Sequence, residues 1–333
     1  MIWLTWRQLR TQAAVVFGLI AVLAVLLAAT GPRLAGRYGT DSFLSEIGGA
    51  DTALYLLGAL ALLALPFVIG MFWGAPMIAR ELEAGTHRLV WTQGSTRTRW
   101  LLTKLGLTGL TAMAAAGLLS LAVTWWSGPI DRAIADASGA GAAPGPGLLI
   151  FPRLSPEIFD SRGIVPLGYA AFAFVLGVTV GVIVARILPA MAIVLALLAV
   201  TQITMSVGVR PHLETPERLT TTITATNILR IDRGGHLTLA IDRPGAWSTA
   251  QRTVNASGRT VRPPSWMGDC LPGPGQRDQG CFARLEREGY RQVVTYQPAG
   301  RFWAIQRDEA LVYLALALLL AGLCAWWTRH RLS

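Results

Sequence analysis

Six stretches of the chain, each about 20 residues long, contain no Asp, Glu, Lys, Arg or His. The hydrocarbon core of a bilayer is about 30 Å thick, and about 20 apolar helical residues cross it. We therefore predict an all-α polytopic membrane protein with six transmembrane helices. The predicted spans are residues 13–30, 53–79, 105–126, 164–185, 187–209 and 310–328, the last followed by a short cytoplasmic tail to residue 333.

The composition excludes the other broad classes of protein. Only 14% of the residues are charged and 53% are hydrophobic, whereas soluble domains carry about 25% charged residues. Intrinsic disorder is excluded for the same reason, because it requires low hydrophobicity and high charge.

Two of the predicted spans are adjacent, and only Arg186 separates them. A single helix over residues 164–209 would be about 69 Å long, which is about twice the thickness of the bilayer core. Arg186 and Pro189 therefore favour a hairpin of two spans.

The first twelve residues have an amphipathic pattern. Ile2, Trp6 and Leu9 recur at helical spacing, and Arg7 and Arg10 lie on the other side. This pattern predicts a helix on the inner membrane surface; the alternative is a simple lead-in to the first span. A cleaved signal peptide is not favoured, because residues 13–36 contain no Ala-x-Ala pair.

The distribution of charge predicts the orientation. The net charge is +10. The short segments on one predicted side carry ten basic residues and two acidic ones. Those on the other side carry five basic residues and seven acidic ones. Positive charge marks the cytoplasmic side, so both termini are expected inside the cell, and no nucleic-acid partner is needed to explain the charge. The inner segments are 1–12, 80–104, 186 and 329–333; the outer ones are 31–52 and 127–163.

Residues 210–309 form a polar block between the last two spans, and we expect a small extracellular domain there, β-rich or irregular. Residues 220–226, 236–241 and 290–297 read as strands, with a turn at 233–235. Cys270 and Cys281 lie in this block, and an oxidising exterior favours a disulfide between them. Metal binding is the alternative. Cys324 is expected to be a packing residue.

Several kinds of chemistry are missing from the chain. The only lysine, Lys104, lies between Thr103 and Leu105, so no Gly-Lys-Ser/Thr phosphate-binding loop can form. His-Glu-x-x-His is absent, and no histidine lies within a span. We expect no catalytic, cofactor-binding or metal site on this chain, and the energy for any transport to come from another protein.

The predicted cytoplasmic loop, residues 80–104, carries the most specific signal. The helix of the second span continues to Glu83, Gly85 breaks it, and a short amphipathic helix with Leu89 and Trp91 follows. Together with the opening Trp3-x-x-Trp6-Arg7-Gln8 and residues 296–303, this loop resembles the membrane subunit of bacterial ABC-2 type exporters. The loop motif is Arg80-Glu81-x-Glu83-x-Gly85-Thr86, then Arg97-x-Arg99 and Lys104.

The resemblance implies a permease with no ATPase site of its own. In that family the loop forms a coupling helix that docks on a separate ATP-binding subunit, which holds ATP and Mg²⁺, and the N-terminal helix is a connecting helix. A complex contains two permeases, identical or related, and two ATP-binding subunits in the cell membrane. The family often has only short helices where this chain has residues 210–309. The docking residues implied here are Glu83, Gly85, Thr86, His87, Arg88, Leu89 and Trp91.

Alternatives remain at three points. The amphipathic loop helix would also suit an anchor in the lipid headgroups. The small-residue pairs Gly70/Gly74 and Gly177/Gly181 would allow close helix packing, within one subunit or between two. A membrane receptor or assembly factor, with an extracellular ligand-binding domain and no ATPase partner, is the alternative function.

Overall fold

The computed structural model describes residues 2–40, 42–84, 97–139, 151–231, 236–270 and 278–331. Within these ranges six helices are long and apolar enough to cross a membrane, as an all-α polytopic protein requires. These candidate spans are Leu9–Arg37, Gly49–Glu83, Trp100–Ala137, Val165–Val184, Ile187–Leu213 and Ala299–His330.

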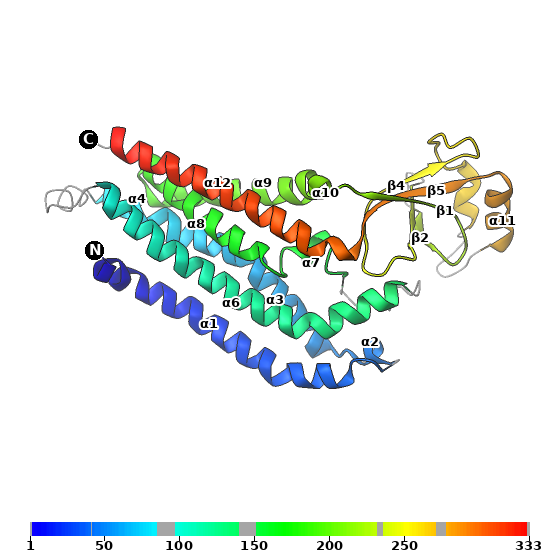
Figure 1. Ribbon diagram of the computed structural model, residues 1–333, viewed down its shortest axis with the longest axis horizontal. Coiled ribbons are helices and arrows are strands. Elements are labelled where there is room, and N and C mark those ends of the chain that lie inside the picture. Colours follow the sequence, from blue (N-terminus) through cyan, green and yellow to red (C-terminus); the bar gives the residue numbers. More distant parts are fainter. Residues whose placement is uncertain are drawn as a thin grey trace.

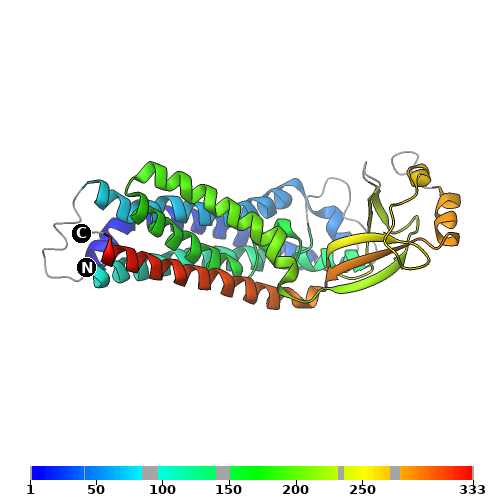
Figure 2. The same cartoon turned by 90° about the horizontal axis from the view of Figure 1, so that it is seen from above.

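The helices form an elongated bundle whose two ends differ (Figures 1 and 2). Both chain termini lie at one end, here called the terminal end. The strands lie beyond the opposite end, here called the strand end. The six spans therefore return the chain to the side on which it starts.

Most spans are longer than the apolar run that defines them, and three contain a change of helix type. The elements are α1 (Ile2–Arg37); α2 (Phe43–Glu46); α3 (Gly49–Val68), the π-helix η1 (Ile69–Gly74) and α4 (Ala75–Glu83); α6 (Arg97–Gly139); α7 (Pro156–Phe159); α8 (Val165–Val184); α9 (Ile187–Thr204), the π-helix η2 (Met205–Val209) and α10 (Arg210–Leu213); and the 3₁₀ turn η4 (Ala299–Arg301) with α12 (Phe302–His330).

Helix α8 is the centre of the bundle. It is apolar on all sides and buried along nearly its whole length, in contact with η1, α4, α6, α9 and α12, as expected for a helix without a polar face. Helices α1, α9 and α12 instead expose large apolar side chains such as Leu19, Leu188 and Leu318. An exposed apolar surface of this kind fits contact with lipid.

The four glycines of the predicted packing pairs lie at one contact within the chain, between α8 and the η1–α4 segment. A Cβ atom at Gly74 would lie 2.5 Å from the Phe174 carbonyl oxygen. One at Gly177 would overlap the Gly70 carbonyl oxygen, and one at Gly181 the Ala75 carbonyl oxygen. The two backbones therefore touch directly, which side chains at these positions would prevent.

The π-helix η1 lies between two prolines of the second span, Pro66 and Pro76. Pro76 has no N–H group, so the carbonyl oxygen of Phe72 loses its α-helical donor. The side-chain Nε2 of Gln12, on α1, donates to that oxygen at 3.4 Å. A contact between helices thus partly replaces the bond that the proline removes.

The helix boundaries differ from the predicted ones. Residues 1–12 are not a separate element, because α1 is continuous from Ile2 to Arg37. The third span continues to Gly139, the fifth reaches Leu213 through η2 and α10, and the sixth begins at Phe302 instead of residue 310. The prediction kept every span free of charged residues, whereas several of the charges that it left out are paired inside the bundle.

The chain beyond α10 forms a small subdomain with two sheets. Strands β1 (Glu217–Thr222), β5 (Arg291–Gln297) and β4 (Trp247–Val254) form an antiparallel sheet in that order, and β2 (Ile228–Ile231) pairs with β3 (Leu237–Leu239). The predicted strand at 290–297 coincides with β5, and the one at 236–241 includes β3. The predicted strand at 220–226 overlaps only the end of β1. Sequence patterns did not predict β2 or β4, and the predicted turn at 233–235 lies outside the described residues.

An apolar cluster stabilises the part of the subdomain that lies farthest from the bundle. It joins the β2–β3 pair to the 3₁₀ helix η3 (Ser265–Cys270) and to α11 (Gln279–Arg287). Ile228, Leu239 and Leu285 are among its buried members.

We predict that Gly177→Ala destabilises the chain by about 1–3 kcal/mol, because the added methyl group forces two backbones apart. Thermal unfolding of the purified chain in detergent would measure the loss. Gly106→Ala is the matched control, since a Cβ atom there meets nothing within 4 Å. Equal stability of the two variants would contradict the packing role.

Candidate functional site

The terminal end contains the predicted docking loop, of which the structure describes the two flanking helices. Gly85, Thr86, His87, Arg88, Leu89 and Trp91 all lie outside the described residues. Glu83, the remaining residue of the set, is the last residue of α4, and α6 begins at Arg97. Residues 85–96 therefore connect the ends of two membrane helices.

The two flanking helices are held together by a buried ion pair between Glu81 of α4 and Lys104 of α6. Lys104 is only 2% exposed, and its ammonium group lies 4.8 Å from the centre of the Trp100 ring. Beside this pair is a cavity of about 160 Å³ that α1 also lines, through Leu9 and Gln12. The helix ends that border the docking loop are thus tied to each other.

Glu83 also connects α4 to the start of α9. Its Oε2 accepts a hydrogen bond from the backbone N–H of Ile187 at 3.2 Å. A carboxylate at a helix N-terminus satisfies a free N–H group and interacts favourably with the helix dipole. The structure therefore places the Glu83 side chain in an interaction within the chain.

The strand end contains a buried ionic network that the sequence did not predict. Arg210 of α10 donates to both carboxylate oxygens of Glu309 on α12, at 2.7 and 2.8 Å, and also pairs with Asp160. The Tyr169 hydroxyl of α8 lies 2.9 Å from Asp160 Oδ1 and 2.5 Å from Glu309 Oε1. Arg210 and Glu309 are completely buried, and the network joins four segments of the chain.

The environment of Asp160 alters its acidity. Burial raises the pKa of this carboxyl above its usual value, the positive charge of Arg210 opposes the rise, and the negative charge of Glu309 adds to it. The raised pKa means that Asp160 retains its proton to a higher pH than an exposed aspartate does.

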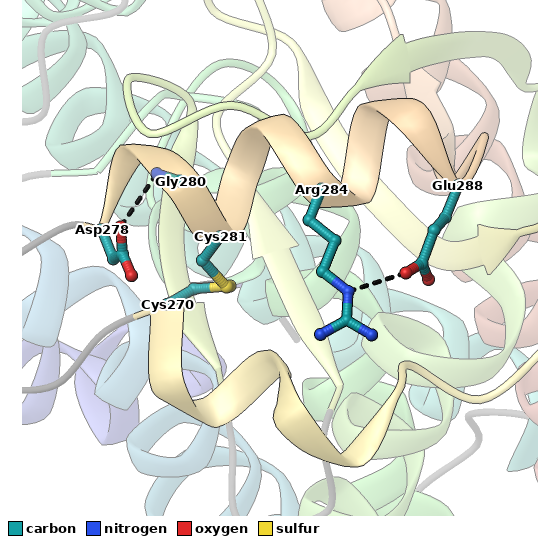
Figure 3. The surroundings of a disulfide bond; sticks show 6 residues. All are labelled: Cys270, Asp278, Gly280, Cys281, Arg284 and Glu288. Carbon is teal, nitrogen blue, oxygen red and sulfur yellow. Dashed lines mark hydrogen bonds and ion pairs between the residues drawn. A yellow bond between two sulfur atoms is a disulfide. The ribbon is translucent and has the colours of Figure 1, made fainter.

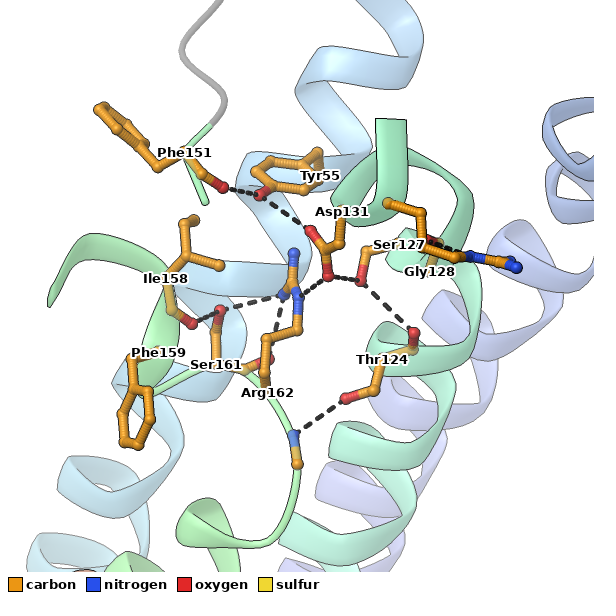
Figure 4. A network of polar contacts seen from close by, with 12 residues as sticks. Tyr55, Thr124, Ser127, Gly128, Asp131, Phe151, Ile158, Phe159, Ser161 and Arg162 are labelled. Atoms are coloured by element: carbon orange, nitrogen blue, oxygen red, sulfur yellow. Dashed lines mark hydrogen bonds and ion pairs between the residues drawn. The ribbon is translucent and has the colours of Figure 1, made fainter. Parts of the chain in front are cut away.

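A second network joins α3, α6 and the segment before α8 (Figure 4). Arg162 Nε donates to Asp131 Oδ2 at 3.0 Å, and Ser127 donates to the same oxygen at 3.1 Å. The Tyr55 hydroxyl lies 3.4 Å from Asp131 Oδ1 and 3.3 Å from the Phe151 carbonyl oxygen. Arg162 is 1% exposed.

Gln306 of α12 caps the start of α8. Its Oε1 accepts hydrogen bonds from the N–H groups of Ile164 and Val165, both at 2.9 Å, and its Nε2 donates to the Phe159 carbonyl oxygen at 3.2 Å. These N–H groups belong to the first turn of a helix and have no acceptor within it. The strand end of the bundle is therefore held by polar contacts from several helices.

Sequence reasoning missed these residues because it assigned them to loops and to the outer block. The partners are far apart in the chain, so no spacing motif reveals them. One signal was available: Arg210 immediately follows one apolar run, and Glu309 immediately precedes another.

Cys270 and Cys281 form a disulfide that joins the end of η3 to α11 (Figure 3). Beside it, Asp278 caps α11 by accepting from the N–H of Gly280 at 2.8 Å. The described residues contain no group of three potential metal ligands among His, Cys, Asp and Glu, and Cys324 is a buried free thiol.

Comparison with protein families identifies the class of the chain. The ABC-2 membrane transporter related family matches residues 17–210, so the chain belongs to that family. The match begins within α1 and ends at the first residue of α10, so it covers most of the helical bundle but neither the strand subdomain nor α12. Among curated proteins and solved structures, no match was found.

Family membership and the six apolar helices together identify a multi-pass membrane protein, a transporter permease of the ABC-2 type. Permeases of this family generally work with an ATP-binding subunit.

We predict an asymmetry between two substitutions in the Arg210 network. Arg210→Gln should cost about 3–5 kcal/mol, because it leaves two buried carboxylates without their cation. Glu309→Gln should cost less, because the Arg210–Asp160 pair remains. Thermal unfolding compares them, with the exposed Arg307→Gln as control. A larger loss for Glu309→Gln would contradict this account of the network.

Removal of the disulfide should loosen only the outer part of the strand subdomain. In a Cys270→Ser/Cys281→Ser variant we expect about 3 kcal/mol less local stability. Hydrogen exchange should then become faster in β2, β3 and α11 but stay slow in α8. Cys324→Ala is the control. Uniformly faster exchange through the bundle would show that the subdomain is not an independent unit.

Proposed function

We propose that this chain is the membrane subunit of an ATP-driven exporter, and that a separate ATP-binding subunit docks on residues 85–96. The observation that supports it most directly is that this segment joins α4 and α6, whose ends are tied by the Glu81–Lys104 pair. A partner that moves the segment would move both helices together.

The packing of the bundle supports transmission of such a movement from this segment to the strand end. Helix α4 contacts α8 through Gly74, Gly177 and Gly181 with backbone against backbone, and α8 contacts α12 along much of its length. Closely packed elements of this kind move as rigid bodies. Displacement of α4 by the partner would thus reach α8, α12 and the strand end.

The charge pattern supports a cytoplasmic terminal end. The basic residues of the short segments are concentrated there, so the strand subdomain would lie outside the cell. ATP and Mg²⁺ would bind to the partner, because the chain has no phosphate-binding loop. Export, a second permease subunit and a bacterial cell membrane follow from the resemblance to ABC-2 exporters.

The decisive experiment first seeks an ATP-binding protein among the products of the neighbouring genes, then co-expresses it with the permease and reconstitutes the pair in nanodiscs. A Leu89→Ala/Trp91→Ala variant should bind the subunit about tenfold more weakly, because tryptophan is among the residues that contribute most to the binding energy of interfaces. Co-purification and ATPase rate measure the effect.

Trp326→Ala is the matched control, since Trp326 is an exposed aromatic residue near the C-terminus, 49% accessible. Unchanged binding by the loop variant would contradict docking at residues 85–96. Failure of the unmodified chain to bind any such subunit would favour the receptor or assembly-factor alternative.

A further inference from the structure

A cavity of about 220 Å³ lies at the strand end, where the bundle meets the strand subdomain. Helix α6 forms one wall, the segment before α8 and the start of α12 form the others, and Gly245 of the subdomain contributes to the lining. Its charged and aromatic lining residues are Asp131, Arg132, Arg153, Arg162, Phe302 and Trp303.

The charge of this lining is unbalanced. It contains three arginines and one carboxylate, and that carboxylate, Asp131, is already paired with Arg162. Within the described part of the chain, no carboxylate lies within 4.0 Å of a guanidinium nitrogen of Arg132 or Arg153. An anion in the cavity would therefore meet two guanidinium groups that have no carboxylate within 4.0 Å among the described residues.

The arginines are held in place by other contacts. Arg153 lies over the Phe302 ring, 4.6 Å from its centre, and Arg132 lies 4.8 Å from the centre of the Tyr38 ring and donates to the Gly128 carbonyl oxygen. Arg162 Nη2 is buried and has no hydrogen-bond acceptor among the described residues. Stacked guanidinium groups keep their in-plane N–H donors available for an acceptor.

The chemistry of this lining suits a phosphate group. Guanidinium groups bind the oxygens of phosphate with two parallel hydrogen bonds, and charge-assisted bonds of this kind are stronger than neutral ones. A water molecule occupies about 30 Å³ in the liquid. The cavity, at about 220 Å³, therefore has room for a phosphate group.

The position of the cavity suits the lipid–water boundary. The cavity lies at the strand end of the bundle, and Trp303 of its lining is 55% exposed. Tryptophan is enriched at the level of the headgroups. Phosphate at this level is supplied by lipid headgroups as well as by the solvent.

We propose that this cavity is a binding site for a phosphate group, carried by an anionic lipid or present as free phosphate. The site lies at the opposite end of the bundle from residues 85–96, on which we propose that the ATP-binding subunit docks. Its occupation requires no ATP-binding subunit, so the purified full-length chain alone tests it.

The test is native mass spectrometry of the chain in detergent, titrated separately with phosphatidylglycerol, phosphatidylcholine and inorganic phosphate. Arg153→Gln and Arg132→Gln should each weaken phosphate-group binding about tenfold, the loss expected for one charge-assisted contact. Arg243→Gln is the matched control, because it removes an exposed charge from the turn next to Gly245 without lining the cavity.

The three titrations distinguish the sources. Binding of phosphatidylglycerol, but not of phosphatidylcholine or inorganic phosphate, identifies a site for an anionic lipid headgroup. Binding of phosphatidylglycerol and inorganic phosphate, in competition, identifies a site for the phosphate group itself. Equal binding of phosphatidylcholine and phosphatidylglycerol would contradict recognition of an anionic group. The proposal is overturned if neither binds, if both arginine variants bind like the unmodified chain, or if Arg243→Gln weakens binding equally. If Arg153→Gln unfolds the chain, binding by Arg132→Gln tests the proposal instead, because Arg132 is exposed and its substitution leaves the fold intact.

Discussion

Direct contact between the backbones of α8 and the η1–α4 segment is the interaction on which the rest of the bundle depends. Lipid supplies no hydrophobic force between helices, so close packing must hold them together. Glycine at positions 70, 74, 177 and 181 permits that approach. Helix α4 packs against one side of α8, and α6, α9 and α12 enclose the rest. Helix α8 is therefore buried along nearly its whole length.

The two ends of the bundle are held together differently. At the terminal end, among the described residues, the Glu81–Lys104 ion pair and the hydrogen bond from the Ile187 N–H to the Glu83 carboxylate tie α4 to its neighbours. At the strand end, Arg210, Arg162 and Gln306 make polar contacts among nearly all the spans. Buried ion pairs contribute little net stability but resist separation, because each separated charge would remain desolvated. Opening of the strand end must therefore break several such contacts together.

The strand subdomain is joined to the bundle by more than its two connections. Gln297 Nε2 donates to the Glu214 carbonyl oxygen at 2.7 Å, and Arg301 contacts Glu217 and the backbone of Thr215. The subdomain also helps to enclose the cavity lined by Arg132, Arg153 and Arg162. The family match ends at residue 210, so the contacts of Gln297 and Arg301 lie beyond it, whereas the three arginines that line the cavity lie within it.

The class of the protein could be read from the sequence, because lipid requires long apolar helices and these leave a pattern that needs no tertiary contact. Six spans and the hairpin at Arg186 follow from that pattern. The ends of the spans do not follow from that pattern, because a charged residue is read as a span boundary when its buried partner is unknown. Asp131 and Arg162 are 31 residues apart, and Arg210 and Glu309 are 99.

Only the fold brings such residues together, so the networks, the cap at Gln306 and the arginine-lined cavity were invisible in the sequence. The sequence by itself determined how many times the chain crosses the membrane. Tertiary structure decided which charges could be buried, because burial depends on partners that folding alone supplies.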